Sequence, residues 1–270
     1  VHYLPKGFSL IAADNKVKPI IGYSFDNNFN IEDLPIQLDS LLSSYTKKYI
    51  DKINSRSQIE SEVTENWEYY LGNDIMDSEN FRDVNPLITA NWDQGGNWDN
   101  MCPGEALVGC VAVSMAQVMY KWGSPTQGSG YHSYTHPDFG FIEADFGNTT
   151  YDFGGMLDNS ATLESQLLLS HSGVAVEMDY GYDGSGAWVC NYDINAKNAL
   201  RDNFNYDSNI ACAIRSDYSD SEWNDLIVNQ LDNGWPIIYR AYYDDFSAGH
   251  AWNIDGYSGD QFHCNWGWGG

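Results

Sequence analysis

The stretch CVAVSMAQVMYKW, which lies between Gly109 and Gly123, has the periodicity of a single amphipathic helix. Its apolar side chains recur mostly at steps of three and four residues, so that they share one face. Gly123 and Pro125 end the pattern, because glycine is common just past a helix and proline cannot continue one. A helix with so continuous an apolar face needs a core to pack against. The residues of that face are Val111, Met115, Val118, Met119 and Trp122.

Helices are expected first and strands second along the rest of this region. Helical periodicity predicts helices over residues 163–172, 194–204 and 222–232, the last with Ser221 as its N-cap. After Pro236 the segments IIYRAYY, HAWNIDGY and QFHCNW have the alternation of strands. Helices followed by an antiparallel sheet predict an α+β fold. A chain of 270 residues, 43% hydrophobic and 15% aromatic, has ample material for its core.

The first 85 residues have a different character and predict a separate domain. The segments GFSLIAAD and VKPIIGYS alternate as two short strands, and residues 36–53 and 57–71 have helical periodicity. Residues 72–86 lose this periodicity and are rich in Asn, Asp and Ser, as linkers are. The charge changes at the same place, from 8 basic against 14 acidic residues before residue 86 to 5 against 24 after it. The boundary is therefore expected near residue 85.

The formal net charge of -25 excludes two classes of partner. Binding to nucleic acid or to an anionic membrane depends on surface lysine and arginine, and this chain has 13 of them against 38 acidic residues. No apolar run reaches the length of about 18 residues that a membrane-spanning helix needs, so the chain is expected to be soluble. The 5 cysteines include no C-x-x-C pair, and no metal site is predicted. An odd number of cysteines leaves at least one thiol free.

Cys110 stands at the first position of the expected helix, where a thiol can be put to chemical use. A helix N-terminus carries partial positive charge, which favours the reactive thiolate. The preceding Gly109 allows a tight turn and the close approach of another chain. An isolated cysteine in an apolar helix is nevertheless more often a buried core residue. Cys110 therefore has a catalytic interpretation only together with a base from elsewhere in the fold.

His250 is the best placed of the 6 histidines to be that base. It stands at the start of an expected strand, and the neighbouring strand brings Asn265 and Trp266, which could orient and shield the imidazole. The alternative is a hydrogen-bonded sheet residue without a catalytic role. Gln94, in the glycine-rich loop WDQGG, is a candidate donor to an oxyanion beside the backbone amide of the nucleophile.

Several segments taken together resemble the streptopain family of secreted bacterial cysteine peptidases, which have a papain-like fold. They are GCVAVSMAQVMYKWGSP, WDQGGNWDN, MDYGYDGSGA, GHAWNIDGY and NWGWGG. The segment GFSLIAADNKVKPIIGYS resembles the inhibitory propeptide of the same family, so the similarity extends over almost the whole chain. The resemblance implies a papain-like peptidase domain over residues 86–270, preceded by a small α+β propeptide over residues 1–80.

The resemblance also implies a role for each matching residue. Cys110 would be the nucleophile and His250 the general base and acid. Gln94 would line the oxyanion hole, and Asn265 or Trp266 would orient the imidazole. The segment WVCNYD departs from the family and looks like an insertion. Three residues would border the substrate cleft. Ser185 and Gly186 come just before this segment, and Gly249 comes just before His250.

The implied function is that of a secreted bacterial cysteine endopeptidase in zymogen form, with proteins or peptides as substrates. Its own propeptide would be its inhibitor, and maturation would cut within residues 72–86. No cofactor or metal is implied, only a reducing agent that keeps Cys110 as a thiol. Two alternatives remain open. One is a catalytically inactive family member, and the other is a surface protein that binds peptide or carbohydrate through its many Trp and Tyr side chains.

Two features depart from the family. Its peptidase domain continues with further strands beyond NWGWGG, so an incomplete sheet is expected at the C-terminal end of this chain. Its members also do not depend on several cysteines. Cys102, Cys190 and Cys212 are therefore expected to be core or surface thiols, with a disulfide of Cys102 as the alternative in an exported protein. Cys264 is expected to point away from Asn265 by strand alternation.

Overall fold

The computed structural model describes residues 1–25, 28–34, 36–55, 58–72, 83–242 and 249–270. The chain divides into two units, Val1–Asn80 with Tyr242–Gly249, and Phe81–Ala241 with His250–Gly270. Most of the linker predicted over residues 72–86 lies outside the described residues. Among the residues that are described, no helix is long and apolar enough to cross a membrane.

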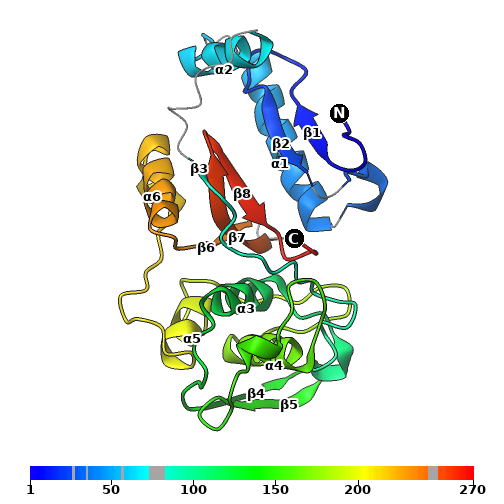
Figure 1. The fold of residues 1–270 in the computed structure, drawn as a ribbon, viewed down its shortest axis with the longest axis vertical. Helices are drawn as coiled ribbons and strands as arrows, with labels where there is room; N and C mark the ends of the chain where they lie inside the picture. The colour runs from blue at the N-terminus through cyan, green and yellow to red at the C-terminus, as the bar shows by residue number, and fades with distance from the viewer. Residues whose placement is uncertain (26–27, 35, 56–57, 73–82, 243–248) are drawn as a thin grey trace. The chain divides into compact units, whose positions relative to one another are not determined.

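The N-terminal unit contains a two-stranded hairpin and two helices, as the sequence predicts (Figure 1). The strands pair antiparallel, with Phe8 opposite Ser24. Both helices have the expected 3.6-residue periodicity, although the second begins later than residue 57. The bounds are β1 (Phe8–Ile11), β2 (Ile20–Ser24), α1 (Ile36–Asn54) and α2 (Ser61–Leu71).

Hydrogen bonds to and from the loop between the two strands hold this unit together. The Trp67 indole N–H donates a hydrogen bond of 2.8 Å to the carbonyl of Val17, whose own side chain is buried. The ammonium of Lys16 donates to the carbonyl of Ile53 near the end of α1, over 2.6 Å. The loop is therefore bonded to both helices, and Val63 of α2 is buried.

The described residues of the C-terminal unit form four α-helices, which confirm those predicted. The first is buried more completely than its amphipathic pattern indicates, since every residue from Val111 to Met119 is buried. The last helix begins earlier than predicted, and its N-cap is Ser219 rather than Ser221. Ser219 and Glu222 form a reciprocal capping box, which a serine two residues later cannot form with the same glutamate. The bounds are α3 (Cys110–Trp122), α4 (Leu163–Ala175), α5 (Ala196–Asp202) and α6 (Asp220–Asp232).

A four-stranded sheet, three of whose strands follow these helices in the chain, confirms the α+β fold (Figure 1). Its long strand β7 pairs with each of the others, and its antiparallel register with β8 places Asn253 opposite Asn265. β7 is buried along almost its whole length, because elements pack on both of its faces. The strands are β3 (Asp83–Val84), β6 (Ile237–Tyr242), β7 (Gly249–Ser258) and β8 (Gln261–Asn265).

A second hairpin, β4 (Tyr131–His136) with β5 (Gly140–Asp145), is absent from the sequence prediction. Its strands are rich in polar and aromatic residues, and few of their side chains are fully buried, so the alternation of apolar and polar residues is weak. Short 3-10 helices complete the unit. They are Pro103–Glu105, Phe153–Gly155 and Arg215–Asp217. A further 3-10 helix, Ile31–Asp33, lies in the N-terminal unit.

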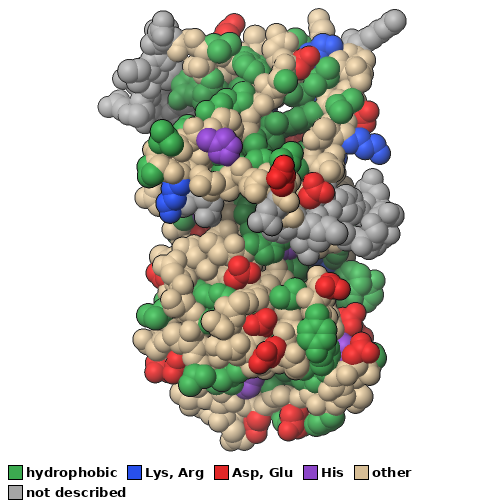
Figure 2. Space-filling model, turned by 90° about the vertical axis from the view of Figure 1, so that its right-hand side faces the viewer, with side chains coloured by type: hydrophobic (Ala, Val, Ile, Leu, Met, Phe, Trp, Pro, Cys, Tyr) green, Lys and Arg blue, Asp and Glu red, His purple; other side chains and the backbone are tan. Residues whose placement is uncertain are grey.

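β7 runs between the two hydrophobic clusters of this unit. Ala251 belongs to the larger cluster, which includes the buried side chains of α3, α4 and α5. Trp252 and Ile254 belong to the smaller cluster, where Ile227 and Leu231 of α6 pack. Successive side chains of a strand point to opposite faces, so β7 joins the helical part to the sheet part. Figure 2 shows Asp and Glu side chains spread over the face that it draws, in keeping with the net charge of -25.

Candidate active site

Cys110 is the first residue of α3, as predicted, and Gly109 is the N-cap before it. Gly109 has a φ of +88°, which glycine adopts without strain. A Cβ at this position would lie 2.6 Å from the sulfur of Met178 and 3.2 Å from the Cβ of Ser185. Both the backbone and the neighbours therefore require glycine directly before the thiol.

The sulfur of Cys110 lies beside β7. Its Sγ accepts a hydrogen bond of 3.4 Å from the backbone N–H of Ala251, the residue after His250. Burial raises the pKa of the Cys110 thiol, and the N–H groups of Ala251, Val111 and Cys110 itself offset this only in part. The sequence suggested that the helix N-terminus would favour the thiolate. In this site burial outweighs that effect, so the thiol needs a base to take its proton.

His250 lies on β7 with 8% of its surface exposed. Its Nε2 is 2.9 Å from the carbonyl oxygen of Trp266. A carbonyl can only accept, so Nε2 carries the proton and Nδ1 keeps its lone pair. Nδ1 is buried and has no hydrogen-bond partner among the described residues. Burial also lowers the pKa of His250 to about 4, against the opposing effect of the Trp266 carbonyl. The imidazole is thus a neutral base with one nitrogen fixed and the other available.

Tryptophan rings lie around this imidazole. Trp268 stacks on His250, with ring centroids 4.1 Å apart and planes 13° from parallel. Trp252 and Trp266 lie further off, with centroids 5.9 and 6.1 Å from that of His250. Trp266 was a candidate from the sequence, whereas Trp268 was missed. The segment NWGWGG holds both residues, but no local pattern shows which indole will face the histidine.

Asn265 lies one residue from the bonded carbonyl, but the structure places its side chain in a different network. Its amide nitrogen donates to the carbonyl of Ala90 over 2.9 Å. Its amide oxygen accepts from Gln117 over 2.9 Å and from the N–H of Gly267 over 3.3 Å. The carbonyl of Trp266, and not the Asn265 amide, is therefore the group bonded to His250.

Gln117 connects the helix that begins with Cys110 to the strands that carry His250 and Asn265, and sequence reasoning missed it. Its amide nitrogen donates to both Ala90 and Asn265, and its oxygen accepts from Asn253 on β7 over 2.9 Å. Asn253 also donates to the carbonyl of Ser114 on α3 over 3.2 Å. Gln117, Asn253 and Asn265 are all buried. We call these three side chains the amide network. This network connects α3 with β7 and β8. Its only sign in the sequence was the polar Gln117 within a largely apolar helix.

Gln94 is buried in the loop that precedes the helix. Its carbonyl accepts a hydrogen bond of 2.8 Å from the N–H of Val108, and its own N–H donates to the carboxylate of Asp93 over 2.6 Å. The loop is thereby held against the residues that lead into Cys110. The role of Gln94 as an oxyanion donor stays a prediction.

Two of the three residues expected to border the substrate cleft, Ser185 and Gly186, belong to a loop that packs against Gly109 through Ser185. The hydroxyl of Ser185 donates to the carbonyl of Leu107 over 2.6 Å. Gly186 forms a two-way backbone pair with Asp179, at 2.9 and 3.0 Å. Gly249 is exposed and begins β7, directly before His250. Ser185 is thus brought next to Gly109, the residue before Cys110, and the binding roles of all three stay predictions.

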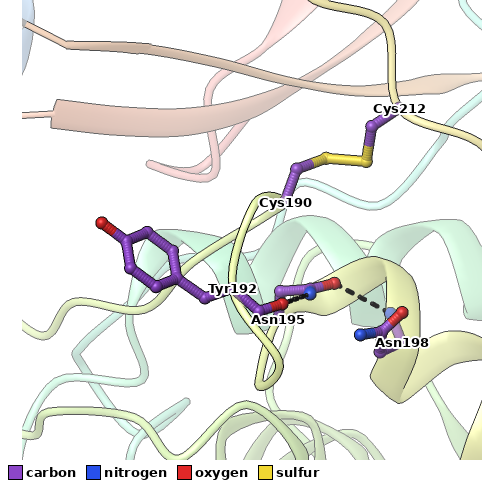
Figure 3. The surroundings of a disulfide bond; sticks show 5 residues. All are labelled: Cys190, Tyr192, Asn195, Asn198 and Cys212. Carbon is purple, nitrogen blue, oxygen red and sulfur yellow. Dashed lines mark hydrogen bonds between the residues drawn. A yellow bond between two sulfur atoms is a disulfide. The ribbon is translucent and has the colours of Figure 1, made fainter.

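The cysteines differ from the sequence expectation. Cys190 and Cys212 form a disulfide, so the prediction that both are thiols is wrong (Figure 3). They lie 22 residues apart, and only the folded path of the chain brings them together. Cys102 and Cys264 are free thiols, and burial raises the pKa of each to about 12. No group of three or more His, Cys, Asp or Glu side chains in the described part of the chain is arranged to hold a metal ion.

Comparison with protein families gives two matches. Residues 92–270 match the Peptidase C10 family, and residues 3–49 match a family described as Spi protease inhibitor. The thiol protease/hemagglutinin PrtT of Porphyromonas gingivalis is 30% identical over 98% of this chain, which spans 32% of PrtT. Streptopain of Streptococcus pyogenes is 26% identical over 98% of this chain and 69% of its own length.

Solved structures give similar results. A fragment of prointerpain A from Prevotella intermedia matches with a TM-score of 0.77 and 29% identity, over 100% of this chain and 84% of the fragment. The active interpain A cysteine protease of the same organism matches with a TM-score of 0.61 and 35% identity, over 70% of this chain and 83% of its own.

Proposed function

This chain belongs to the peptidase C10 family, and from that premise we propose that it is a cysteine endopeptidase made as a zymogen. Its fold is papain-like with an inhibitor-like region before it, as in prointerpain A. One observation carries the proposal. The Nε2 proton of His250 is bonded to the Trp266 carbonyl, and the buried Nδ1 keeps its lone pair. The residue after His250 on the same strand, Ala251, donates its backbone N–H to the Cys110 sulfur.

The first half of the reaction uses this arrangement. Nδ1 of His250 takes the proton of the Cys110 thiol as the sulfur attacks the carbonyl carbon of the scissile peptide bond. The backbone N–H of Cys110 and the side chain of Gln94 donate to the oxyanion that forms. The imidazolium then gives its proton to the departing amine, and a thioester to Cys110 remains.

The second half reverses the roles of the same groups. Nδ1 takes a proton from water, and the resulting hydroxide attacks the thioester carbon. The thiolate leaves and recovers its proton from the imidazolium, so the new carboxyl end is released and the enzyme is restored. In both halves the Trp266 carbonyl stabilises the charged imidazole, and the Trp268 ring keeps water from it.

The first eighty residues are the inhibitory propeptide in this proposal, and cleavage within residues 72–86 releases the active enzyme. The match of residues 3–49 to a protease inhibitor family supports this. Proteins and peptides are the substrates. Because the relatives are bacterial, the enzyme is a bacterial one, and we place it outside the cell, where a disulfide such as Cys190–Cys212 persists.

Casein hydrolysis under mild reductant tests the proposal. The chain is assayed before and after limited proteolysis, with Cys110→Ala as the matched inactive variant. Activity should appear only after loss of about the first eighty residues and should be absent from the variant. A folded, processed protein without activity would favour the inactive or binding-protein alternatives instead.

A further inference from the structure

The β4–β5 hairpin contributes no residue to the proposed mechanism, but one face of its first strand is bonded to a distant segment. Side chains at every second position of a strand share a face. Three such side chains of β4 bond to three successive residues of the segment that leads into the loop beside Gly109. They are His132, Tyr134 and His136, and they bond to Glu177, Met178 and Asp179, respectively. We call the three side chains of β4 the brace.

Tyr134 is the middle member of the brace. Its hydroxyl donates a hydrogen bond of 2.7 Å to the carbonyl of Met178. Burial, with a smaller effect of the nearby carboxylates, raises the pKa of Tyr134, so the hydroxyl keeps the proton that it donates. On one side of it, Nε2 of His132 lies 3.0 Å from the carboxylate of Glu177. The backbone of Met178 is therefore tied to β4 directly and through the residue before it.

His136 completes the brace with a ring that the hairpin turn holds in place. Its Nδ1 accepts from the backbone N–H groups of Asp138 and Phe139, at 3.1 and 3.3 Å. Nε2 therefore carries the proton and donates to the carboxylate of Asp179 over 3.2 Å. The ring of His136 is buried, whereas the side chain of Asp179 is 87% exposed. A buried ring with a fixed direction thus holds an exposed carboxylate.

The segment held by the brace touches the residue before the nucleophile. Asp179 exchanges two backbone hydrogen bonds with Gly186, at 2.9 and 3.0 Å, and so closes the loop between them. Met178 is buried, and its sulfur would lie only 2.6 Å from a Cβ at Gly109. Met178 therefore packs directly on the N-cap of α3, which begins with Cys110.

The closed loop is also bonded to the chain just before Gly109. The hydroxyl of Ser185 donates to the carbonyl of Leu107 over 2.6 Å, and the N–H of Leu107 donates to the carbonyl of Gly181 over 3.2 Å. Closely packed interiors transmit displacements, because they contain few voids that could absorb them. The contacts therefore run without a break from β4, through the loop, to the backbone of Cys110.

We propose that His132, Tyr134 and His136 are positioning residues for the nucleophile, because they hold residues 177–179 against Gly109 and so fix the backbone of Cys110. The inference rests on the proposed peptidase function. In that mechanism the backbone N–H of Cys110 donates to the oxyanion, and a small displacement of this donor slows the chemical step without weakening the binding of substrate.

Tyr134→Phe tests the brace, because it removes one hydroxyl and keeps the ring. In the processed chain, with active enzyme counted by titration with an irreversible thiol reagent, kcat for a peptide should fall by about fivefold and KM should stay within about twofold. Tyr131→Phe is the matched control. It removes a hydroxyl from the opposite face of the same strand, where Tyr131 donates to Glu143, and it should leave kcat unchanged.

Asp179 gives a second test that does not endanger folding, since its side chain is largely exposed. Asp179→Ala removes the acceptor of the His136 proton, so kcat per active site should fall by about two- to threefold. Asp179→Asn keeps an oxygen that can accept the same hydrogen bond and should restore the wild-type kcat. Thermal unfolding is followed in parallel, because a merely structural role would lower Tm in Asp179→Ala and leave kcat per active site unchanged.

Three results would overturn the inference. These are a wild-type kcat per active site in Tyr134→Phe, a rise in KM with kcat unchanged, and an Asp179→Asn variant no more active than Asp179→Ala. The second result would assign the brace to substrate binding instead of the nucleophile. Failure of the peptidase proposal is seen separately, as the absence of Cys110-dependent hydrolysis by the processed wild-type chain.

Discussion

The two halves of the proposed active site are built in different ways. Cys110 is placed by local structure, at the end of a helix that is buried from Val111 to Met119 and that begins after a glycine with positive φ. His250 is placed by contacts from a distant segment, the carbonyl of Trp266 and the ring of Trp268. The nucleophile is therefore fixed by packing along one element, whereas the base depends on the path of the chain after β8.

Each half lacks a group that would ionise its own residue. Burial raises the pKa of Cys110 and lowers the pKa of His250 to about 4, so each half on its own keeps its group neutral. Neither a helix end nor a strand produces a reactive thiolate in isolation. In the proposed mechanism, reactivity arises where the halves meet, at the Ala251–Cys110 hydrogen bond and through the amide network.

Removal of the proposed base, His250, should cause the largest loss of activity. His250→Ala leaves the thiol with no group to take its proton, so kcat/KM for a peptide substrate should fall by at least about 10³-fold. The variant should still fold, because neither His250 nor the tryptophans stacked with it belong to the larger hydrophobic cluster of α3, α4 and α5. Activity near the wild-type level would show that another group is the base.

Substitution at the two ends of α3 tests the helical half. Gly109→Ala forces a Cβ to within 2.6 Å of Met178 at a positive φ, and a shift of the nucleophile should lower kcat/KM by about 10²-fold. Gly123→Ala is the matched control, because Gly123 has a φ of +57° and no atom within 4 Å of an added Cβ. It should cost about 1–2 kcal/mol of stability and leave kcat/KM unchanged. Equal losses of activity would contradict the role given to Gly109.

The connection between the halves is tested at Gln117. Gln117→Met keeps the volume but leaves Ala90, Asn253 and Asn265 short of hydrogen bonds, so stability should fall by about 1–3 kcal/mol. We expect kcat to fall by about tenfold with KM unchanged, since the catalytic groups lose register. Active enzyme is counted by titration with an irreversible thiol reagent. If kcat per active site is unchanged, the amide network is only structural.

The smallest effect on activity is expected when the imidazole of His250 is exposed to water. Trp268→Ala lets water reach His250, so its pKa should rise from about 4 toward its ordinary value. The reaction needs neutral His250, and a higher pKa means that protonation inactivates the enzyme at a higher pH. The acid limb of the kcat/KM profile should therefore move up by about 1 pH unit. An unmoved acid limb would show that Trp268 does not shield the base.

Local patterns predicted the helical half of the site and its elements. The apolar stripe and its flanking glycines predicted α3 with Cys110 at its start, and strand alternation predicted β6, β7 and β8. These predictions succeed because each depends on residues within one element. The β4–β5 hairpin was missed because its alternation is weak.

The rest depends on contacts between segments far apart in sequence. A backbone carbonyl is present in every residue, so no side-chain pattern could select that of Trp266 as the partner of His250. The amide of Asn265 was an equally reasonable candidate, but it is occupied by Gln117 and Ala90. The stacking of Trp268 and the pairing of Cys190 with Cys212 likewise follow from the folded path.

Alkylation of the cysteines in the processed chain is the most direct test of the thiol and base as a pair. Iodoacetamide is added at neutral pH and each modified peptide is quantified, in wild type and in His250→Ala. Cys102 and Cys264 serve as internal controls, because burial raises the pKa of each to about 12. We predict that Cys110 reacts far faster than either in wild type, and that its rate falls toward theirs without His250. A slow Cys110 in wild type, or an equally fast one in the variant, would contradict the pairing.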